Sequence, residues 1–177
     1  GDKVIKIGIF EPASGENGPG GKQEVLGVRY AHSLQPNVEI NGETYKVELV
    51  EVDNQSDTTK AVSAAQNLVA SNVSVILGSY GSGVAIAGGD TFKTAQIPAI
   101  GISCTNPQVT DGNDYYFRVC FLDPFQGTVM ANFAKDELQA NNAFIITQLG
   151  DDYSAGLGNY FKQAFTALEG NVQEAQF

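Results

Sequence analysis

A turn rich in glycine and serine carries the groups best suited to bind a small anion. Gly78, Gly81 and Gly83 follow the apolar run 73–77, and a helix is expected to begin near Ser82. Glycine allows turn conformations that other residues avoid, and a helix N-terminus offers backbone N–H groups with a partial positive charge. We therefore expect this turn to hold the carboxylate of a small ligand. The simpler alternative is a strand–helix connection in which Ser82 only caps its own helix.

Groups for catalysis are scarce in the sequence. The single histidine, His32, falls in the middle of a predicted helix, and Cys104 has no histidine near it in the chain, so a nucleophile lacks an obvious base. Cysteine and histidine are too few for a structural zinc site, no Walker pattern is present, and the first strand is not followed by Gly-x-Gly-x-x-Gly. Asp53, Asp151 and Asp152 follow predicted strands and could hold a cation, but a solvated acidic loop fits so acidic a chain better. The sequence predicts a binding protein that is not an enzyme and has no cofactor or metal.

The chain is acidic and has the composition of an ordinary globular protein. Of its 177 residues, 42% are hydrophobic and 17% are charged, and the net charge is −10. This charge argues against nucleic acid and anionic membranes as partners, but not against a zwitterion held by local donors. No apolar run reaches transmembrane length. Gly1–Lys3 leads directly into a predicted strand, so the sequence reads as a mature or trimmed product. Spacing leaves open whether Cys104 and Cys120 pair.

Predicted strands alternate with predicted helices along the chain. The strands are expected at 4–10, 45–52, 73–77, 97–102, 115–120, 142–147 and 171–177. Asn41-Gly42 predicts a hairpin turn before the second of them, and 11–22 is expected to be a loop. Helices are expected at 23–34, after Asp57, from Ser82 to about Gln96, from Asp123, and between the 148–153 loop and Gly170.

The spacing of apolar residues predicts the buried faces of three helices. The helix after Asp57 has a stripe of mainly small residues: Ala61, Ala64, Ala65, Leu68 and Val69. The helix from Asp123 is expected to bury a larger set: Phe125, Val129, Met130, Phe133 and Leu138. The last helix is expected to bury a mixed set: Leu157, Phe161, Ala164, Phe165 and Leu168.

This alternation predicts an α/β fold with a mostly parallel sheet. Open parallel sheets bind ligands beyond the carboxyl ends of their strands. In this chain those ends are expected at 11–21, 53–57, 79–83, 103–105 and 148–153, and several of them are rich in Gly, Ser and Thr.

Five stretches, in this order, carry a family resemblance: 5–15, 50–69, 76–82, 97–107 and 117–127. Together they resemble the amino-terminal half of extracytoplasmic solute-binding proteins of the branched-chain amino acid (Leu/Ile/Val-binding) type. The resemblance covers essentially the whole chain. It implies the type I periplasmic binding fold, whose lobes are three-layer α/β/α structures with a parallel, flavodoxin-like sheet. Residues 1–121 would form the first ligand-binding lobe, and 122–177 would begin an incomplete second lobe.

The resemblance also implies roles for particular residues. Ser82 would bind the α-carboxylate of an amino acid through its hydroxyl and neighbouring N–H groups, and Thr105 would offer its N–H to the carboxylate and its hydroxyl to the ammonium. The Ser103 carbonyl would accept from the ammonium. The remaining site residues would be Ser14, Tyr80, Gly81 and Tyr153. The alternative for each is a polar loop residue bonded to its own backbone.

On this resemblance the chain is the substrate-binding component of an ABC-type amino acid transporter, with an ABC permease as partner. It would lie outside the cytoplasm, in the periplasm or as a lipoprotein on a Gram-positive cell. The alternatives are a flavodoxin-like module that binds a cofactor or phosphate at 78–83, and a receptor-type ligand-sensing domain. An incomplete second lobe implies a fragment, a complementing chain or self-association. The sequence leaves open which amino acid or amide is bound.

Overall fold

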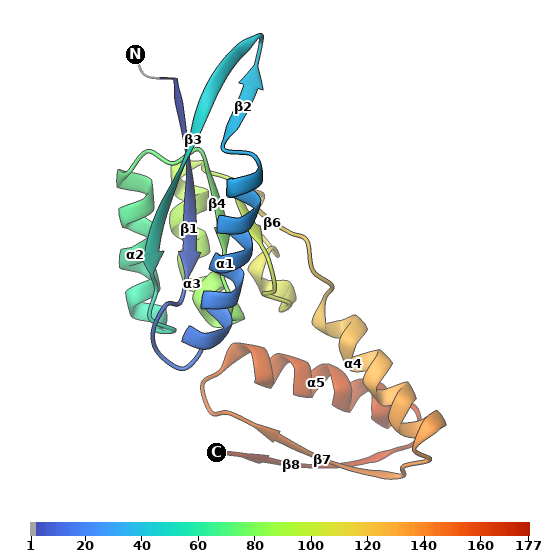
Figure 1. Ribbon diagram of the computed structural model, residues 1–177. Helices are drawn as coiled ribbons and strands as arrows, with labels where there is room; N and C mark the ends of the chain where they lie inside the picture. The colour runs from blue at the N-terminus through green and yellow to red at the C-terminus, as the bar shows by residue number, and fades with distance from the viewer. Residues whose placement is uncertain (1–2) are drawn as a thin grey trace. The chain divides into compact units, whose positions relative to one another are not determined.

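The chain forms two compact units, each with its own sheet (Figure 1). The computed structural model describes residues 3–177, so Gly1 and Asp2, on which the expectation of a trimmed product partly rests, lie outside the described residues. The first unit runs from the start of the described chain to Cys104 and includes Gln108–Cys120. The second unit consists of Thr105–Pro107 and Phe121–Phe177.

The first unit is built on a mostly parallel sheet with the strand order β2-β3-β1-β4-β5-β6 (Figure 1). β2 and β3 pair antiparallel, and every other neighbouring pair is parallel. The strands are β1 (Val4–Glu11), β2 (Asn37–Ile40), β3 (Glu43–Asp53), β4 (Val75–Gly78), β5 (Ala99–Gly101) and β6 (Tyr116–Arg118). The predicted strands and the α/β class are confirmed, and the parallel pairing brings the carboxyl ends of β1, β3, β4 and β5 to one edge of the sheet.

The predicted hairpin between β2 and β3 is confirmed. Asn41 and Gly42 have φ values of 52° and 79°, as a two-residue turn with both central residues in the left-handed region requires. Ile40 pairs with Glu43 across this turn.

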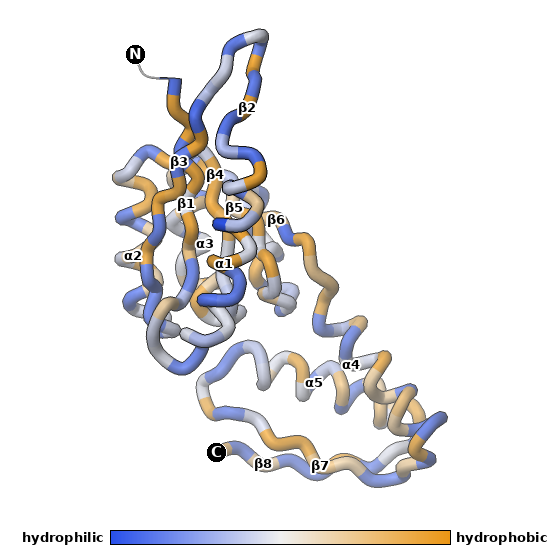
Figure 2. Tube along the Cα trace, in the orientation of Figure 1, coloured by the Kyte–Doolittle hydropathy of each residue, from blue (hydrophilic) through white to orange (hydrophobic). Residues whose placement is uncertain are grey.

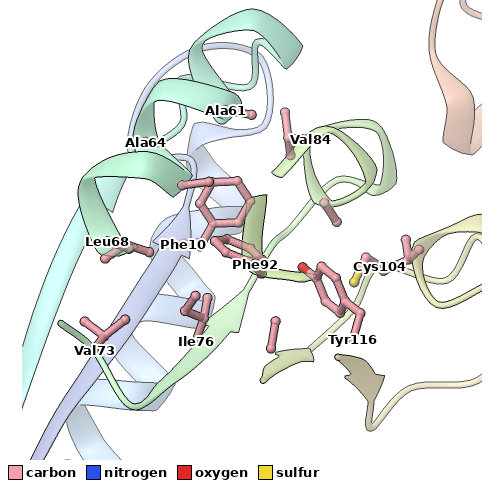
Figure 3. Close-up of a cluster of buried hydrophobic side chains, with 14 residues drawn as sticks. Phe10, Ala61, Ala64, Leu68, Val73, Ile76, Val84, Phe92, Cys104 and Tyr116 are labelled. Atoms are coloured by element: carbon pink, nitrogen blue, oxygen red, sulfur yellow. The ribbon is translucent and has the colours of Figure 1, made fainter. Parts of the chain in front are cut away.

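An apolar core fills the space between the sheet and two helices, α2 (Thr58–Ala70) and α3 (Ser82–Ala95) (Figure 3). Phe10, Ile76 and Phe92 are fully buried, and the rings of Phe10 and Phe92 meet edge-on with centroids 5.1 Å apart. Burying each of these side chains contributes about 1.5–3 kcal/mol. The predicted small-residue stripe of α2 is confirmed by the buried residues of that helix: Ala61, Ala64, Ala65 and Leu68.

Helix α1 (Gly18–Leu34) begins before the predicted position at residue 23, so part of the loop predicted at 11–22 is helical. Pro19 fits the first helical turn, where its missing N–H has no helical partner in any case. Glycine at the next two positions allows a close approach, because a Cβ on Gly21 would overlap the Pro12 carbonyl oxygen and one on Gly20 would overlap the Tyr80 ring. The glycines that read as a loop signal are therefore packing residues of a helix.

The space between α1 and the sheet is only partly filled. A cavity of about 510 Å³ lies there, with mainly apolar walls that include Ile7, Val28, Ala31, Leu49 and Leu77. The buried residues of α1 are Gly18 and Gly21, whereas α2 buries three alanines and a leucine. Helix α1 therefore contributes less apolar burial than α2 does.

The second unit is a β-α-β structure preceded by a helix (Figure 1). Its strands β7 (Asn142–Thr147) and β8 (Asn171–Gln176) pair in parallel and confirm the predicted strands, and α5 (Asp152–Ala167) connects them. The Asp151 carboxylate caps α5 by accepting the Ser154 N–H at 2.8 Å. Phe165 is fully buried, but Leu168, which was predicted on the buried face of this helix, is 37% exposed just beyond its end.

The predicted buried face of α4 (Asp123–Asn132) is wrong. Its large apolar residues are exposed, and so are those of the following π-helical turn η2 (Phe133–Glu137) and Leu138: Phe125, Val129, Met130, Phe133 and Leu138. Figure 2 shows the apolar character of this segment. The buried residues are Asp123, Gly127 and Ala131, because α4 packs on α5 so closely that a Cβ on Gly127 would lie 2.7 Å from the Phe161 nitrogen.

Candidate functional site

The N-terminus of α3 lies at the carboxyl end of β4, joined to it by the turn 78–82. Gly78 and Gly81 have φ values of 126° and 98°, and a Cβ on Gly78 would overlap the Phe10 carbonyl oxygen. Gly81 is the N-cap residue and Ser82, 2% exposed, is the first residue of the helix. Ser82 is therefore not the N-cap residue, and the simpler alternative, in which Ser82 only caps its own helix, is wrong. Because Gly81 has no side chain, the N-cap residue of α3 makes no side-chain hydrogen bond to the first turn of the helix.

Hydrogen bonds from neighbouring strands hold this turn in place. The Tyr80 N–H donates to Glu11 Oε2 at 2.7 Å, and the Asn54 side-chain amide donates to the Ser79 hydroxyl at 2.8 Å. The Tyr116 hydroxyl donates to the Gly78 carbonyl at 2.6 Å. Residues at or next to the ends of β1, β3 and β6 therefore hold the 78–80 backbone that leads into Ser82.

Ser14 belongs to a second loop at the same edge, and Asp53 at the end of β3 holds it there. The Ser14 hydroxyl donates to Asp53 Oδ2 at 2.6 Å, and the Ala13 N–H donates to Asp53 Oδ1 at 2.8 Å. Burial raises the pKa of Asp53, but these hydrogen bonds, with another from the Gln55 N–H, outweigh burial and lower it. Asp53 is thus an anchor for the 13–14 loop. Among residues 3–177, no three His, Cys, Asp or Glu side chains cluster so as to hold a metal ion.

Ser103 follows β5 and is joined to α1. Its hydroxyl donates to Glu24 Oε1, and the carboxyl group of Glu24 is a neighbour of that of Glu11. Burial, and then the neighbouring Glu24 carboxyl group, raises the pKa of Glu11 to about 10. The first unit therefore contains five of the predicted site residues, namely Ser14, Tyr80, Gly81, Ser82 and Ser103.

The other two predicted site residues, Thr105 and Tyr153, belong to the second unit. The Thr105 hydroxyl donates to Asp123 Oδ1 at 2.6 Å, and the Asp123 N–H donates to the Thr105 carbonyl at 3.0 Å. Tyr153, in the first turn of α5, is 38% exposed, and its hydroxyl lies 3.4 Å from the Gln126 amide nitrogen. Thr105 is thus fixed at the start of α4.

The cysteine and histidine side chains are partly or fully removed from solvent. Cys104 and Cys120 are free thiols, so the question of their pairing is answered for the described structure. Burial, and then the neighbouring Cys120, raises the pKa of Cys104 to about 12. Nε2 of His32 lies 2.9 Å from the Val47 carbonyl oxygen, so it carries the proton and donates it to the backbone of β3. This arrangement offers hydrogen-bonding groups for recognition.

Sequence reasoning missed four polar residues that bind the predicted site residues or the turn that carries them. Glu11, Asn54 and Asp123 are buried, and Glu24 is partly buried. Glu11 directly follows the apolar strand residue Phe10, and a polar residue at that position is a signal that could have identified it. Asn54 directly follows Asp53, the last residue of β3, and gives no such signal. Glu24 gives no comparable signal, because its partners become visible only after α1 packs against the sheet.

Comparison with known proteins places this arrangement in a family. A family model described as periplasmic binding protein matches residues 4–177. The chain belongs to this family. A relative named amino acid binding protein, from Pseudomonas aeruginosa, is 32% identical over 158 residues, which are 88% of this chain and 41% of that protein. Among the described residues of this periplasmic binding protein, no helix has both the length and the apolar character to cross a membrane.

Solved structures confirm the expected type I periplasmic binding fold. The leucine binding protein LivK from Thermotoga maritima is 35% identical with a TM-score of 0.93, over 98% of this chain and 49% of that chain. The branched-chain amino acid substrate binding protein LivJ from Streptococcus pneumoniae, solved with isoleucine, is 30% identical with a TM-score of 0.85, over 98% of this chain and 49% of that one. The chain thus spans about half the length of the periplasmic binding proteins that it matches.

Proposed function

We propose that this chain is the ligand-recognising part of the substrate-binding component of an ABC-type transporter for branched-chain or related amino acids. It binds the amino acid outside the cytoplasm and passes it unchanged to an ABC permease. Residues 1–121 serve as the first lobe of this binding protein and 122–177 as part of the second. The names of its relatives support an amino acid as ligand.

The N-terminus of α3 is the observation that carries the proposal. Its cap is a glycine, its first residue is Ser82, and hydrogen bonds from three strand ends hold the preceding turn. An α-carboxylate at this point receives the Ser82 hydroxyl and backbone N–H groups in the positive field of the helix. Gly81 leaves room for the carboxylate to approach the backbone, because it has no side chain.

The other residues complete recognition of a zwitterion. The Ser103 carbonyl accepts from the ammonium. The Thr105 hydroxyl gives its one proton to Asp123, so its lone pairs accept from the ammonium while its N–H serves the carboxylate. Tyr80, Ser14 and Tyr153 border the side chain of the amino acid. Charge-assisted hydrogen bonds of this kind offset the cost of removing both charges from water.

Ligand-dependent stabilisation of the full-length protein tests the proposal. L-leucine at about a hundred times its dissociation constant should raise the free energy of unfolding by about 2.7 kcal/mol, seen as a higher thermal midpoint. 4-Methylpentanoate, which keeps the carboxylate and side chain of leucine but lacks the ammonium, should give a much smaller shift.

Two variants connect this shift to the site. Ser82→Ala combined with Thr105→Ala should abolish the leucine shift, whereas Ser63→Ala, at an exposed position of α2, should retain it. A full shift in the double variant would remove Ser82 and Thr105 from the site. If a panel of amino acids, amides and sugars gives no shift, the transport proposal is wrong.

A further inference from the structure

The carboxyl groups of buried Glu11 and partly buried Glu24 contact the loops that carry the first-unit half of the proposed site. Glu11, the last residue of β1, is 1% exposed and accepts the Tyr80 N–H at 2.7 Å. Glu24 of α1 accepts the Ser103 hydroxyl, and its carboxyl group is close enough to that of Glu11 to raise the pKa of Glu11. Hydrogen bonds therefore join Glu11 to the 78–82 turn and Glu24 to the residue that follows β5, and the two carboxyl groups are neighbours.

The remaining oxygens of the pair need a proton. Glu11 Oε1 and Glu24 Oε2 are buried and accept from no N–H or hydroxyl donor. Two buried carboxylates side by side repel each other, and both lose the hydration that would stabilise their charge. One proton shared between the two groups removes one charge and supplies the missing donor. The raised pKa of Glu11, caused by burial and then by Glu24, agrees with this arrangement.

We propose that Glu11 and Glu24 are positioning residues for the amino acid site, and that their shared proton holds the 78–82 turn and Ser103 in fixed positions relative to each other. This proposal rests on the proposed function. Glu11 fixes the Tyr80 N–H, and thereby the backbone that leads into Ser82. Glu24 fixes Ser103, whose carbonyl is proposed to bind the ammonium. The proton also keeps a second negative charge away from the helix terminus that receives the ligand carboxylate.

Other titratable groups around the pair do not share its role. Burial raises the pKa of Tyr116, with Glu11 adding to the rise, and burial also raises the pKa of Cys104 and Cys120. These groups therefore stay neutral through neutral pH. The Arg118 guanidinium donates to the Cys104 carbonyl at 2.7 Å. A change in charge between neutral and mildly alkaline pH consequently falls on the carboxyl pair.

Affinity for L-leucine in the full-length protein tests the positioning role. Glu11→Gln keeps an acceptor for the Tyr80 N–H and gives Glu24 a permanent donor, so its dissociation constant at neutral pH should stay near that of the wild type. Glu11→Ala leaves both partners unpaired and should weaken binding about tenfold. Glu39→Gln is the charge-matched control, since Glu39 is exposed on β2 opposite Thr44, at the start of β3 and away from the carboxyl ends of the strands.

The pH profile separates a shared proton from simple packing. The wild-type dissociation constant should rise relative to that of Glu11→Gln as the pH rises toward 10, because only the wild type loses the proton. The ammonium of leucine titrates in the same range, but its effect cancels in the ratio of the two constants. The proposal would be overturned if the ratio of the wild-type and Glu11→Gln dissociation constants stays constant with pH. It would also be overturned if the Glu11→Ala variant binds leucine like the wild type.

Further measurements keep the test decisive. If Glu11→Ala does not fold, Ser103→Ala removes only the hydroxyl donor to Glu24 and should still weaken leucine binding; unchanged binding would contradict the connection to Ser103.

If the wild type binds no amino acid, the proposed function fails, and the positioning role of Glu11 and Glu24 is then tested by hydrogen exchange at the Tyr80 N–H. Exchange there should be faster in Glu11→Ala, or in Glu24→Ala, than in Glu11→Gln. Equal rates would reject the positioning role by itself.

Discussion

Gly21 shows how the absence of a side chain fixes where a loop and a helix meet. A Cβ at this position would overlap the Pro12 carbonyl oxygen, whereas a Cβ on Gly27, also in α1, would meet nothing within 4 Å. The two glycines therefore differ in role although they lie in one helix. Gly21 keeps α1 against the loop that follows β1, and Gly27 only lowers the helix propensity.

Alanine at these two positions should therefore have opposite effects on the 177-residue chain. Gly21→Ala should lower the free energy of unfolding by about 1–3 kcal/mol, because backbone must shift to make room. Gly27→Ala should raise it by up to about 1 kcal/mol through helix propensity. Urea denaturation monitored by circular dichroism measures both, and shifts of the same sign would show that close packing at Gly21 does not limit stability.

At the scale of elements, small residues decide how α4 meets α5. Gly127 and Ala131 are buried in this contact, while Met130 is 49% exposed. The backbone of α5 lies directly over Gly127, whose added Cβ would stand 2.7 Å from the Phe161 nitrogen. Large apolar side chains would hold the helices apart, so they project from the other side of α4.

Substitutions on the two sides of α4 should separate these roles. Gly127→Ala should cost the 177-residue chain about 1–3 kcal/mol of unfolding free energy, despite the better helix propensity of alanine. Met130→Ala should change it by less than about 0.5 kcal/mol, as is usual for an exposed position. A larger loss in Met130→Ala than in Gly127→Ala would mean that the exposed face of α4 carries the packing.

The elements that the sequence predicts well are those with a regular apolar period. The strands β1 and β3, the hairpin turn at Asn41-Gly42 and the alanine stripe of α2 follow from local pattern alone. The start of α1 and the buried face of α4 were mispredicted for one physical reason. In both, glycine allows two elements to pack closely. In the sequence alone, such a glycine resembles a turn residue, or a helix position with no side chain to bury.

At the scale of the molecule, the order of strand ends could be predicted, but the contacts among them could not. Parallel strands bring Ser14, Ser82 and Ser103 to one edge of the first unit, as expected from the alternation of elements. The carboxyl pair that joins two of these ends depends on a strand, a helix and two loops packing together. No spacing in the sequence encodes the meeting of Glu11 with Glu24.

Three carboxyl groups connect folding to pH, in opposite directions. The pKa of Glu11 in the folded state is raised from 4.5 to about 10 by burial and then by Glu24. Its contribution to the free energy of unfolding is therefore complete below pH 4.5 and is lost as the pH rises toward 10. Burial raises the pKa of Asp53, but hydrogen bonds outweigh burial, so the pKa is lowered overall. The Thr59 hydroxyl, and then backbone N–H donors, lower the pKa of Asp57. The contributions of these two aspartates are present above their unfolded value of 3.8 and are lost as the pH falls below it.

Because of Glu11, the free energy of unfolding should fall as the pH rises from about 5 to about 8. Cys104, Tyr116 and Cys120, whose pKa values are raised, remain protonated in this range and do not contribute to the fall. One proton retained by the folded state changes the free energy of unfolding by at most about 1.4 kcal/mol per pH unit. Urea midpoints across this range should decline in the wild type and in the Glu39→Gln control, which both keep the Glu11 proton. They should be nearly level in Glu11→Gln, because glutamine does not titrate. An undiminished decline in Glu11→Gln would assign the effect to general repulsion in a chain of net charge −10, and adding salt would then reduce it.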